Sequence, residues 1–396
     1  MQSHFDDFLT QSSRILFLQG PVGGYFFNLG EQLTKEHSKV VFKINFNGGD
    51  RYFYPETTPK TVSFSGSPSE FQDFLIDFIR QNHIDAVVCF GDNRIYHRIA
   101  KQVCNDFQTA VSFWVFEEGY FRPHYITFER SGVNDYSTEP RDAEFYQQQT
   151  YLLSEPRPPK PVAPGFRPLA KLASQYYWQM YRQRHDYPHY QHHRSTRLLW
   201  YIKAWGESGL VRLKVKAKEN HLAKQVEHGQ LGNFFIVPLQ VHNDSQIKVH
   251  SPFKSVAAFI QCIVKSFAQN APINTKLVIK HHPMDIGFVD YGKLIKKLTK
   301  HYQLQDRIYY VYNIPLPIFL RRARGMVVVN STSAISAMIH HLPVKMLGKA
   351  NYDIDGLVDR QDLADFWQNS KPLNYAVFHG FYCYQLQRTQ LNATFY

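Results

Sequence analysis

Two adjacent carboxylates, Glu117 and Glu118, end the apolar run 110–119 and are followed closely by Gly119 and Arg122. Neighbouring carboxylates repel each other, and this repulsion together with partial burial raises the pKa of one of them. Such a carboxyl group suits general acid or base catalysis. A solvated turn, in which Gly119 only permits a bend, would carry the same residues. The motif alone does not decide between a catalytic pair and a turn.

A cationic and imidazole-bearing turn, Lys280-His281-His282-Pro283, follows a second apolar run. An imidazole beside a lysine can bind a nucleotide phosphate or donate a proton to it. Pro283 would fix the turn that presents the preceding histidine. The alternative is a structural histidine that caps a loop. A zinc set of His281, His282 and Asp285 is less well supported, because adjacent residues on an extended chain point to opposite faces.

Hydroxyl and amide groups follow a third run. Asn330, Ser331, Thr332 and Ser333 open a helical pattern that continues to residue 341. Backbone N–H groups and hydroxyls at such a position form an anion site, although an ordinary helix N-cap has the same composition.

A fourth motif, Gln240 to Asp244, follows the apolar run that begins at residue 233. The carboxylate of Asp244 could be a nucleophile, a base, or only the residue that opens the next turn. The motif by itself favours the turn.

These motifs need elements that position them, and the apolar patterns indicate a parallel α/β architecture. Disorder is excluded as the main state, since 15% of the 396 residues are aromatic. Short runs rich in β-branched or aromatic residues predict buried strands. These runs are 14–19, 39–46, 85–91, 110–119, 233–240, 276–283, 307–313, 325–331 and 343–348. Helical spacing separates many of them, at 24–37, 69–83, 254–269, 287–301, 315–323 and 333–341. Ligands of such sheets bind beyond the carboxyl ends of the strands, where all four motifs lie.

The order of these patterns predicts two Rossmann-type domains with a helical insertion. We expect an N-terminal domain over 1–150, a proline-rich linker and helical insertion over 151–228, a second Rossmann-type domain over 229–350, and a helical tail over 351–396. The linker contains six prolines between residues 154 and 168, which remove backbone donors and stiffen the chain.

The charge balance, 45 Lys plus Arg against 33 Asp plus Glu, gives +12 and indicates an anionic partner. A nucleotide, a nucleic acid or an anionic membrane surface would each fit, but no recognised nucleic-acid module is present. The N-terminus lacks the features of a signal peptide, and no apolar stretch approaches about 18 residues. Four widely spaced cysteines without a CxxC pair favour a reducing compartment. We therefore expect a cytoplasmic protein with peripheral membrane contact, for which the aromatic and basic stretch 176–198 is the candidate.

Taken together, the motifs resemble the CMP-sugar glycosyltransferases of bacterial capsule synthesis. Segments 115–134, 240–245, 280–283 and 327–348 are similar to the KpsS family of capsule polysaccharide export proteins and its relative KpsC. The resemblance implies a GT-B-like fold and a retaining β-Kdo transferase that uses CMP-β-Kdo. It further implies a lysophosphatidylglycerol acceptor at the anionic inner-membrane surface, and no nucleic acid.

The resemblance also assigns roles. Asp244 would attack the anomeric carbon, and Glu117 or Glu118 would act as acid/base toward the acceptor. The expected CMP-Kdo-binding residues are Lys280, His282, Pro283, Asn330, Ser331, Thr332, Ser333, Arg122 and Gln240. The family pattern is Glu-Asp-Gly where this chain has Glu-Glu-Gly, so it is open which carboxylate faces the substrate.

Lysine and histidine could neutralise the CMP phosphate, and we therefore expect no metal or other cofactor. Partners would include a KpsC-like transferase and the capsule export complex. Two alternatives remain, an inverting sialyltransferase that uses CMP-sialic acid and a non-enzymatic component of the export machinery.

Overall fold

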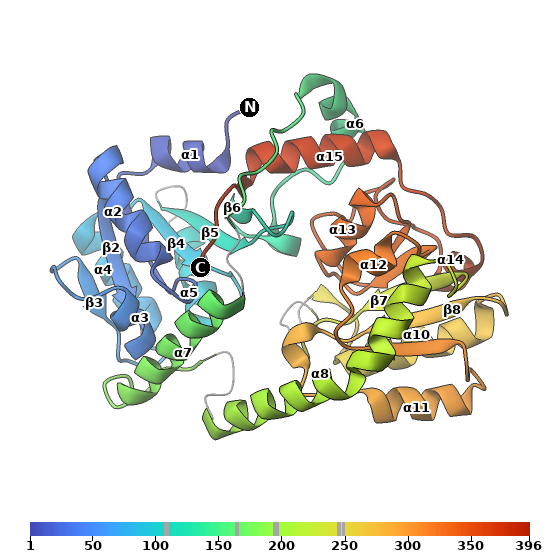
Figure 1. Cartoon of the computed structure of the whole chain (residues 1–396). Helices are drawn as coiled ribbons and strands as arrows, with labels where there is room; N and C mark the ends of the chain where they lie inside the picture. The colour runs from blue at the N-terminus through green and yellow to red at the C-terminus, as the bar shows by residue number, and fades with distance from the viewer. Residues whose placement is uncertain (107–110, 163–165, 193–197, 244–246, 248–249) are drawn as a thin grey trace. The chain divides into compact units, whose positions relative to one another are not determined.

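The computed structural model describes the chain except for residues 107–110, 163–165, 193–197, 244–246 and 248–249. The chain forms two compact units. Unit 1 comprises Met1–Glu139, Leu152–Thr196 and Tyr382–Tyr396, and unit 2 comprises Pro140–Tyr151 and Arg197–Phe381. Figure 1 colours the chain by residue number, from blue at the N-terminus to red at the C-terminus.

Unit 1 contains a seven-stranded sheet in the order β12-β6-β5-β4-β1-β2-β3. Strands β1 to β5 run parallel, whereas β6 pairs antiparallel with β5, and β12 antiparallel with β6. The strands are β1 (Arg14–Phe17), β2 (Val40–Asn45), β3 (Thr61–Ser63), β4 (Ala86–Phe90), β5 (Ser112–Glu118), β6 (Ile126–Arg130) and β12 (Gln390–Leu391). The helices are α1 (His4–Gln11), α2 (Tyr25–His37), α3 (Gly48–Phe53), α4 (Phe71–Asn82), α5 (Ile95–Asp106), the short η1 (Asn134–Tyr136) and α7 (Phe166–Arg182).

Helices cover both faces of this sheet because successive strand residues point to opposite sides. Ile15 and Phe17 of β1 are buried in a cluster with residues of α1 and α2. Leu16 and Leu18 are buried with residues of α4 and α5. The strands therefore read as nearly continuous apolar runs, as expected for a parallel sheet buried on both faces.

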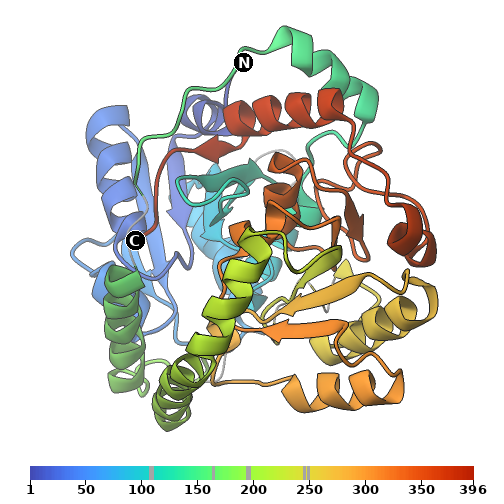
Figure 2. The same ribbon diagram turned by 45° about the vertical axis from the view of Figure 1, so that its right-hand side comes forward.

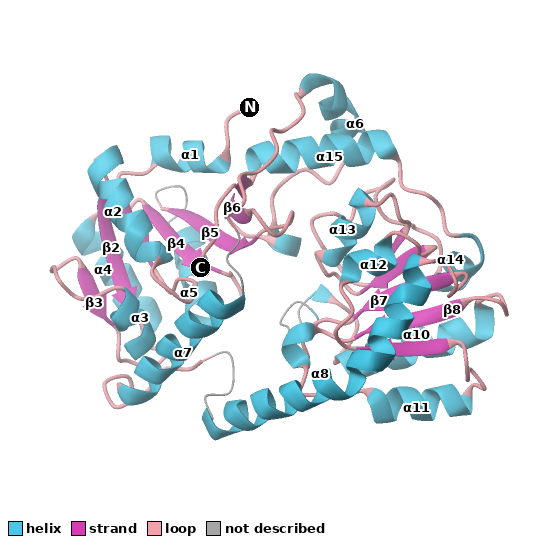
Figure 3. Ribbon diagram, viewed as in Figure 1, coloured by secondary structure: helices cyan, strands magenta, loops and turns pink. Residues whose placement is uncertain are grey.

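Unit 2 contains a five-stranded, wholly parallel sheet in the order β11-β10-β7-β8-β9. Its strands are β7 (Phe234–Pro238), β8 (Lys276–Lys280), β9 (Ile308–Val311), β10 (Gly325–Val328) and β11 (Val344–Met346). Its helices are α6 (Ala143–Leu152), α8 (Leu198–Glu227), α10 (Val256–Asn270), η2 (Pro283–Asp285), α11 (Gly292–His301), α12 (Leu316–Leu320), α13 (Ser333–Ile339) and α14 (Leu363–Asn369). Figure 3 shows helices flanking the strands of each sheet.

These two sheets confirm the predicted α/β class with two Rossmann-type units, which is the domain content of a GT-B-like fold. Each of the nine predicted strands is present, although most are shorter than the apolar run that predicted them. The run continues past the strand because the first residues of the following loop are also buried, as at Leu239 and Val329.

The segment 151–228 divides between the units, with residues 152–196 in unit 1 and the helix α8 in unit 2. The proline-rich part lies along unit 1, where Asn392 accepts a hydrogen bond from the N–H of Lys160 (2.8 Å) and donates one to its carbonyl (3.0 Å). In both views α8 runs beside the strands of unit 2 (Figures 1 and 2).

The tail after residue 350 also divides between the units. It contains α14 and α15 (Tyr375–Arg388), as the helical prediction requires, but it ends in the strand β12. The side chain of Gln390 accepts a hydrogen bond from the N–H of Tyr120 (3.0 Å), and Phe395 is buried among the aromatic rings of unit 1. The last 15 residues therefore belong to the core of the N-terminal unit.

The aromatic stretch that begins at residue 176 has two faces. Tyr176, Met180 and Tyr187 are buried, whereas Trp178 and Tyr181 are 53% and 46% exposed. Helix α7 approaches α3 closely at Gly49, where an added Cβ atom would lie 2.8 Å from the carbonyl oxygen of Tyr176. The stretch is thus an amphipathic helix and a following loop. No helix in the described part of the chain is both long and apolar enough to cross a membrane.

Candidate functional site

The polar motifs of unit 2 gather at one edge of its sheet. Gln240 follows β7, His281 and His282 follow β8, and Asn330 follows β10. Because the five strands are parallel, their carboxyl ends meet at the same edge. This edge is where open α/β sheets bind their ligands.

Lys280, the last residue of β8, is a buried cation at this edge, with 7% of its surface exposed. The pKa of its ammonium group is lowered to about 8, mainly by burial; the carboxylate of Glu219 opposes this shift, and the nearby guanidinium of Arg212 adds to it. A ligand phosphate beside Lys280 would offset the cost of holding a charge there.

The two histidines after β8 have different surroundings. His281 is buried, and its Nδ1 lies 2.7 Å from the hydroxyl of Tyr310. The backbone N–H of Met284 donates to Nδ1 of His282 (3.2 Å). An accepting Nδ1 places the proton of a neutral imidazole on Nε2, so His282 can donate a hydrogen bond from that atom. His281 is therefore held by contacts within the protein. His282 lies in the turn that it forms with Pro283.

A His–Asp pair stands beside this turn. The backbone N–H of His242 donates to the carboxylate of Asp285 (2.6 Å), and His242 Nδ1 lies 2.8 Å from the same group. Asp285 is 1% exposed. The pair links the loop after β7 to the turn after β8.

The loops after β7 and β10 are joined by a pair of side-chain amides. Gln240 Nε2 donates to Asn330 Oδ1 (3.0 Å), and the N–H of Asn330 donates to Gln240 Oε1 (3.4 Å). Both residues are 8% exposed. These two predicted binding residues thus fix the backbone of the edge.

The serine-rich start of α13 combines the two interpretations made from sequence. Ser331 Oγ accepts hydrogen bonds from the N–H and the hydroxyl of Ser333 (3.2 and 2.9 Å), as in a capping turn. Tyr352 donates to the carbonyl of Ser331 (2.7 Å). Thr332 occupies the N-cap position without a side-chain cap bond. The hydroxyls of Ser331 and Thr332 are half-buried at the sheet edge.

Helix α8 brings two charged residues to this edge that sequence reasoning missed. Arg212 donates to Asn313 Oδ1 (3.0 Å) and to the carbonyl of Pro283 (3.4 Å). Glu219 accepts from the N–H groups of Tyr312 and Asn313 (2.5 and 2.9 Å). No sequence signal singles them out, because they lie in an ordinary charged helix. Arg212 adds a second cation beside the Lys280–His282 turn.

Asp244, the predicted nucleophile, lies outside the described residues. Within the described ranges no group of three or more His, Cys, Asp or Glu side chains could hold a metal ion.

The acidic pair of unit 1 ends β5, and its two carboxylates leave the strand on opposite faces. Glu117 lies on the face of Val115, beside Gly91 at the end of β4. Glu118 lies on the face of Phe116, where Tyr396 donates to its Oε1 (3.0 Å). The structure therefore separates two groups that are adjacent in sequence.

The carboxyl group of Glu117 has properties suited to proton transfer. Burial raises its pKa to about 7, with smaller contributions from Glu118 and Asp92, while the N–H of Glu118 opposes the shift by donating to Oε1 (2.9 Å). Glu129 also has a raised pKa, mainly from burial. However, Glu129 lies within β6 and is bound by the hydroxyls of Tyr120 and Ser137.

The turn after Glu118 explains the glycine of the motif. A Cβ atom at Gly119 would lie 2.0 Å from the carbonyl oxygen of Tyr125, so this position requires glycine. Arg122, in the same turn, is exposed and donates through Nε to the carbonyl of Gly119 (3.2 Å). Gly119 thus permits the bend, as in the turn interpretation. The bend does not involve the carboxylates of Glu117 and Glu118.

Comparison with known proteins identifies close relatives over the whole chain. Residues 85–396 match the family model described as capsule polysaccharide biosynthesis protein. The chain is 48% identical to the capsule polysaccharide modification protein LipB of Neisseria meningitidis serogroup A, covering 100% of this chain and 94% of that protein. It is 36% identical to the capsule polysaccharide export protein KpsS of Escherichia coli, covering 100% of both.

Solved structures give a more distant likeness. Thermosulfurimonas dismutans KpsC, described as a β Kdo 2,7 transferase, is 14% identical, with 92% of this chain and 89% of that chain covered, at a TM-score of 0.42. At that score the likeness carries no inference about the chemistry of this chain.

Proposed function

The chain belongs to the family of capsule polysaccharide biosynthesis proteins, and we propose that it is a retaining glycosyltransferase. In this proposal it transfers Kdo from CMP-β-Kdo to a lysophosphatidylglycerol-type acceptor. The observation that carries the proposal is the cationic edge of unit 2, where Lys280, His282 and Arg212 adjoin the ends of β8 and β9. Such groups suit a sugar donor whose leaving group is a nucleotide phosphate.

Departure of CMP requires neutralisation of its phosphate. Lys280 and Arg212 supply positive charge, and His282 supplies a donor at Nε2. These three groups can stabilise the leaving phosphate without a metal, although the absence of a metal requirement stays a prediction. Gln240, Asn330, Ser331, Thr332 and Ser333 complete the proposed binding edge.

Retention at the anomeric carbon requires two inversions. We assign the first attack to Asp244, which would form a covalent glycosyl–enzyme intermediate as CMP leaves. In the second step an acceptor hydroxyl attacks the anomeric carbon, its proton passes to a general base, and Asp244 leaves as a carboxylate. Glu117 suits that base better than Glu118, because its pKa is raised to about 7 and Glu118 is hydrogen-bonded to Tyr396.

A lipid acceptor requires contact with a membrane surface, and α7 offers a suitable face. Its exposed residues recur at helical spacing and combine basic and aromatic side chains, namely Arg167, Lys171, Trp178, Tyr181 and Arg182. Such a face suits the interface of an anionic bilayer. Contacts with a KpsC-like transferase and the export complex stay predictions.

The test is a donor comparison with purified protein. CMP-Kdo and CMP-sialic acid are offered separately with a fluorescent lysophosphatidylglycerol, and released CMP and product are quantified. The proposal expects turnover with CMP-Kdo, no turnover with CMP-sialic acid, and none in Asp244→Asn. Turnover with CMP-sialic acid alone would identify a sialyltransferase, and none with either donor would favour a non-enzymatic role.

A further inference from the structure

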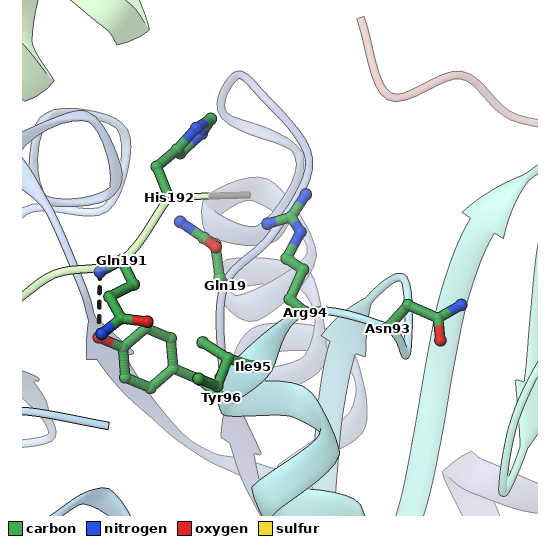
Figure 4. A pocket seen from close by; sticks show the side chains of 7 residues that line it. All are labelled: Gln19, Asn93, Arg94, Ile95, Tyr96, Gln191 and His192. Atoms are coloured by element: carbon green, nitrogen blue, oxygen red, sulfur yellow. Dashed lines mark hydrogen bonds between the residues drawn. The ribbon is translucent and has the colours of Figure 1, made fainter. Parts of the chain in front are cut away.

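The sheet of unit 1 has a pocket at its topological switch point, separate from the acidic pair. Strand β1 pairs with β2 on one side and with β4 on the other, and ligands of such sheets bind beyond the carboxyl ends at this point. The pocket has a volume of about 230 Å³ (Figure 4). Its lining residues are Gln19 after β1, Asn93, Arg94, Ile95 and Tyr96 after β4, and Gln191 and His192 after α7.

Arg94 supplies the charge of this pocket. Figure 4 shows its guanidinium reaching into the same space as Gln19, whereas Asn93 points away. Its Nη1 makes one long hydrogen bond, 3.4 Å to the carbonyl of Gly20, and the group lies 5.4 Å from the centre of the Phe90 ring. No carboxylate of the described residues forms an ion pair with Arg94. Its positive charge is therefore available to an anionic ligand.

Neighbouring side chains hold two other polar residues of the pocket, Gln19 and His192, in position. The amide nitrogen of Gln19, a buried residue, donates to the hydroxyls of Tyr176 and Tyr190 (3.0 and 2.9 Å). This arrangement leaves the amide oxygen on the side of Arg94, where it can accept from a ligand hydroxyl (Figure 4). The imidazole of His192 packs beside Tyr190, with ring centres 5.9 Å apart.

Two opposite charges lie behind the wall, the Lys43 ammonium and the Asp50 carboxylate, and the amide of Gln19 also donates to Asp50 (3.2 Å). The pKa of the Lys43 ammonium is lowered to about 8, mainly by burial and to a smaller extent by the proximity of Arg94. The carboxylate of Asp50, which opposes these effects, accepts hydrogen bonds from Tyr176 (2.8 Å) and the N–H of Phe46 (3.1 Å). A ligand anion would reduce the repulsion between the two cations.

We propose that this pocket is the acceptor headgroup subsite, which binds a phosphodiester-linked polyol with Arg94 as counter-ion to the phosphate. The inference rests on the proposed function and names the part of the acceptor that unit 1 recognises. The volume is below the roughly 300–1,000 Å³ of pockets for larger ligands, so it suits a small headgroup better than a nucleotide sugar. Glu117 ends the strand next to β4, and neighbouring strands lie about 4.8 Å apart. Glu117 itself lies beside Gly91, in the segment that leads from β4 to Arg94, so the pocket and this carboxylate border the same loop.

The experiment measures binding of glycerophosphoglycerol, the water-soluble headgroup of phosphatidylglycerol, by calorimetry with the full chain. Inorganic phosphate and CMP are titrated in parallel. Arg94→Gln is compared with Arg98→Gln, which removes an exposed arginine one turn further along α5. We expect Arg94→Gln to weaken headgroup binding at least tenfold and to raise the KM for the lipid acceptor, with CMP affinity and kcat nearly unchanged. Arg94→Lys should restore part of the affinity, and Arg98→Gln should behave as wild type.

Three results would overturn the subsite. They are headgroup affinity unchanged in Arg94→Gln, an equal loss of CMP affinity, and binding of inorganic phosphate without binding of the headgroup. Failure of the proposed function gives a different result. In that case the wild type binds the headgroup through Arg94 but transfers no Kdo, and the pocket assignment stands.

Discussion

At the scale of single residues, Glu117 and Glu118 differ in what holds their carboxylates. Glu118 accepts a hydrogen bond from Tyr396, whereas Glu117, near the end of β5, lies beside Gly91 and has a pKa raised by burial to about 7. We expect Glu117→Gln to lower kcat by about 10²- to 10⁴-fold, the usual contribution of a general base. Glu118→Gln is the matched control and should lose far less. Wild-type kcat should rise with pH up to about 7, and a larger loss in Glu118→Gln would reverse the assignment.

The carboxyl group of Glu117 should also make the stability of the fold depend on pH. Its pKa is higher in the folded chain than the ordinary value of 4.5, so the folded state binds the proton more tightly than the unfolded state. Stability therefore falls as pH rises from about 4.5 through about 7. Glu117→Gln removes this cost and should be more stable than wild type at pH 8 by on the order of 1–2 kcal/mol, after allowance for solvent screening. Urea unfolding at pH 5 and pH 8 measures the difference, and an equal effect at both values would contradict it.

Nucleotide binding provides a residue-scale test in unit 2. His282→Ala should weaken CMP binding by about tenfold or more, since it removes a hydrogen bond to a charged phosphate. His301→Ala, at an exposed histidine that ends α11, is the control. Wild-type affinity should also fall as pH rises above about 8, because Lys280 loses its proton there. Calorimetry that finds CMP affinity unchanged in His282→Ala would remove this residue from the phosphate site.

At the scale of elements, the strand patterns located more of the candidate site residues than the helix patterns did. The run KLVIK placed Lys280 and His282 at a strand end, and AVSFWVFEE did the same for Glu117, because buried parallel strands have a distinctive composition. Arg212 was missed, since its approach to Pro283 depends on how α8 packs on unit 2. Strands β3, β6 and β12 were also missed. The pairing of Leu391 with Ile126 joins residues 265 positions apart, which no local pattern encodes.

Helix α7 carries the membrane prediction. Trp178 and Tyr181 are exposed beside basic residues of the same helix, so the double variant Trp178→Ala/Tyr181→Ala should bind less to vesicles containing phosphatidylglycerol. Tyr151→Ala provides a control at a tyrosine that is 80% exposed on α6. Each basic residue near an anionic surface contributes about 1 kcal/mol of attraction, and because salt screens this attraction, binding should weaken as the salt concentration rises. Co-sedimentation that is indifferent to salt, to anionic lipid and to both aromatic residues would exclude this face.

At the scale of the whole molecule, each Rossmann-type unit is built from segments that are distant in sequence. Residues 382–396 belong to unit 1, and they supply the partners of Tyr120 and Glu118. The C-terminal segment is thus part of the structure that positions the acidic pair. The net charge of +12 agrees with a protein that has a nucleotide, a phosphodiester headgroup and an anionic surface as its proposed partners.

The proposed transfer of Kdo to a lysophospholipid can be measured by mass spectrometry of the reaction product. Purified protein is incubated with CMP-Kdo and a fluorescent lysophosphatidylglycerol, with Glu117→Gln and Asp244→Asn in parallel. We expect a lipid heavier by one Kdo residue for the wild type, with a β linkage in the NMR spectrum of the purified product, far less of it for Glu117→Gln in the same time, and none for Asp244→Asn. An unmodified lipid with fully folded wild-type protein, or an α-linked product, would contradict this expectation.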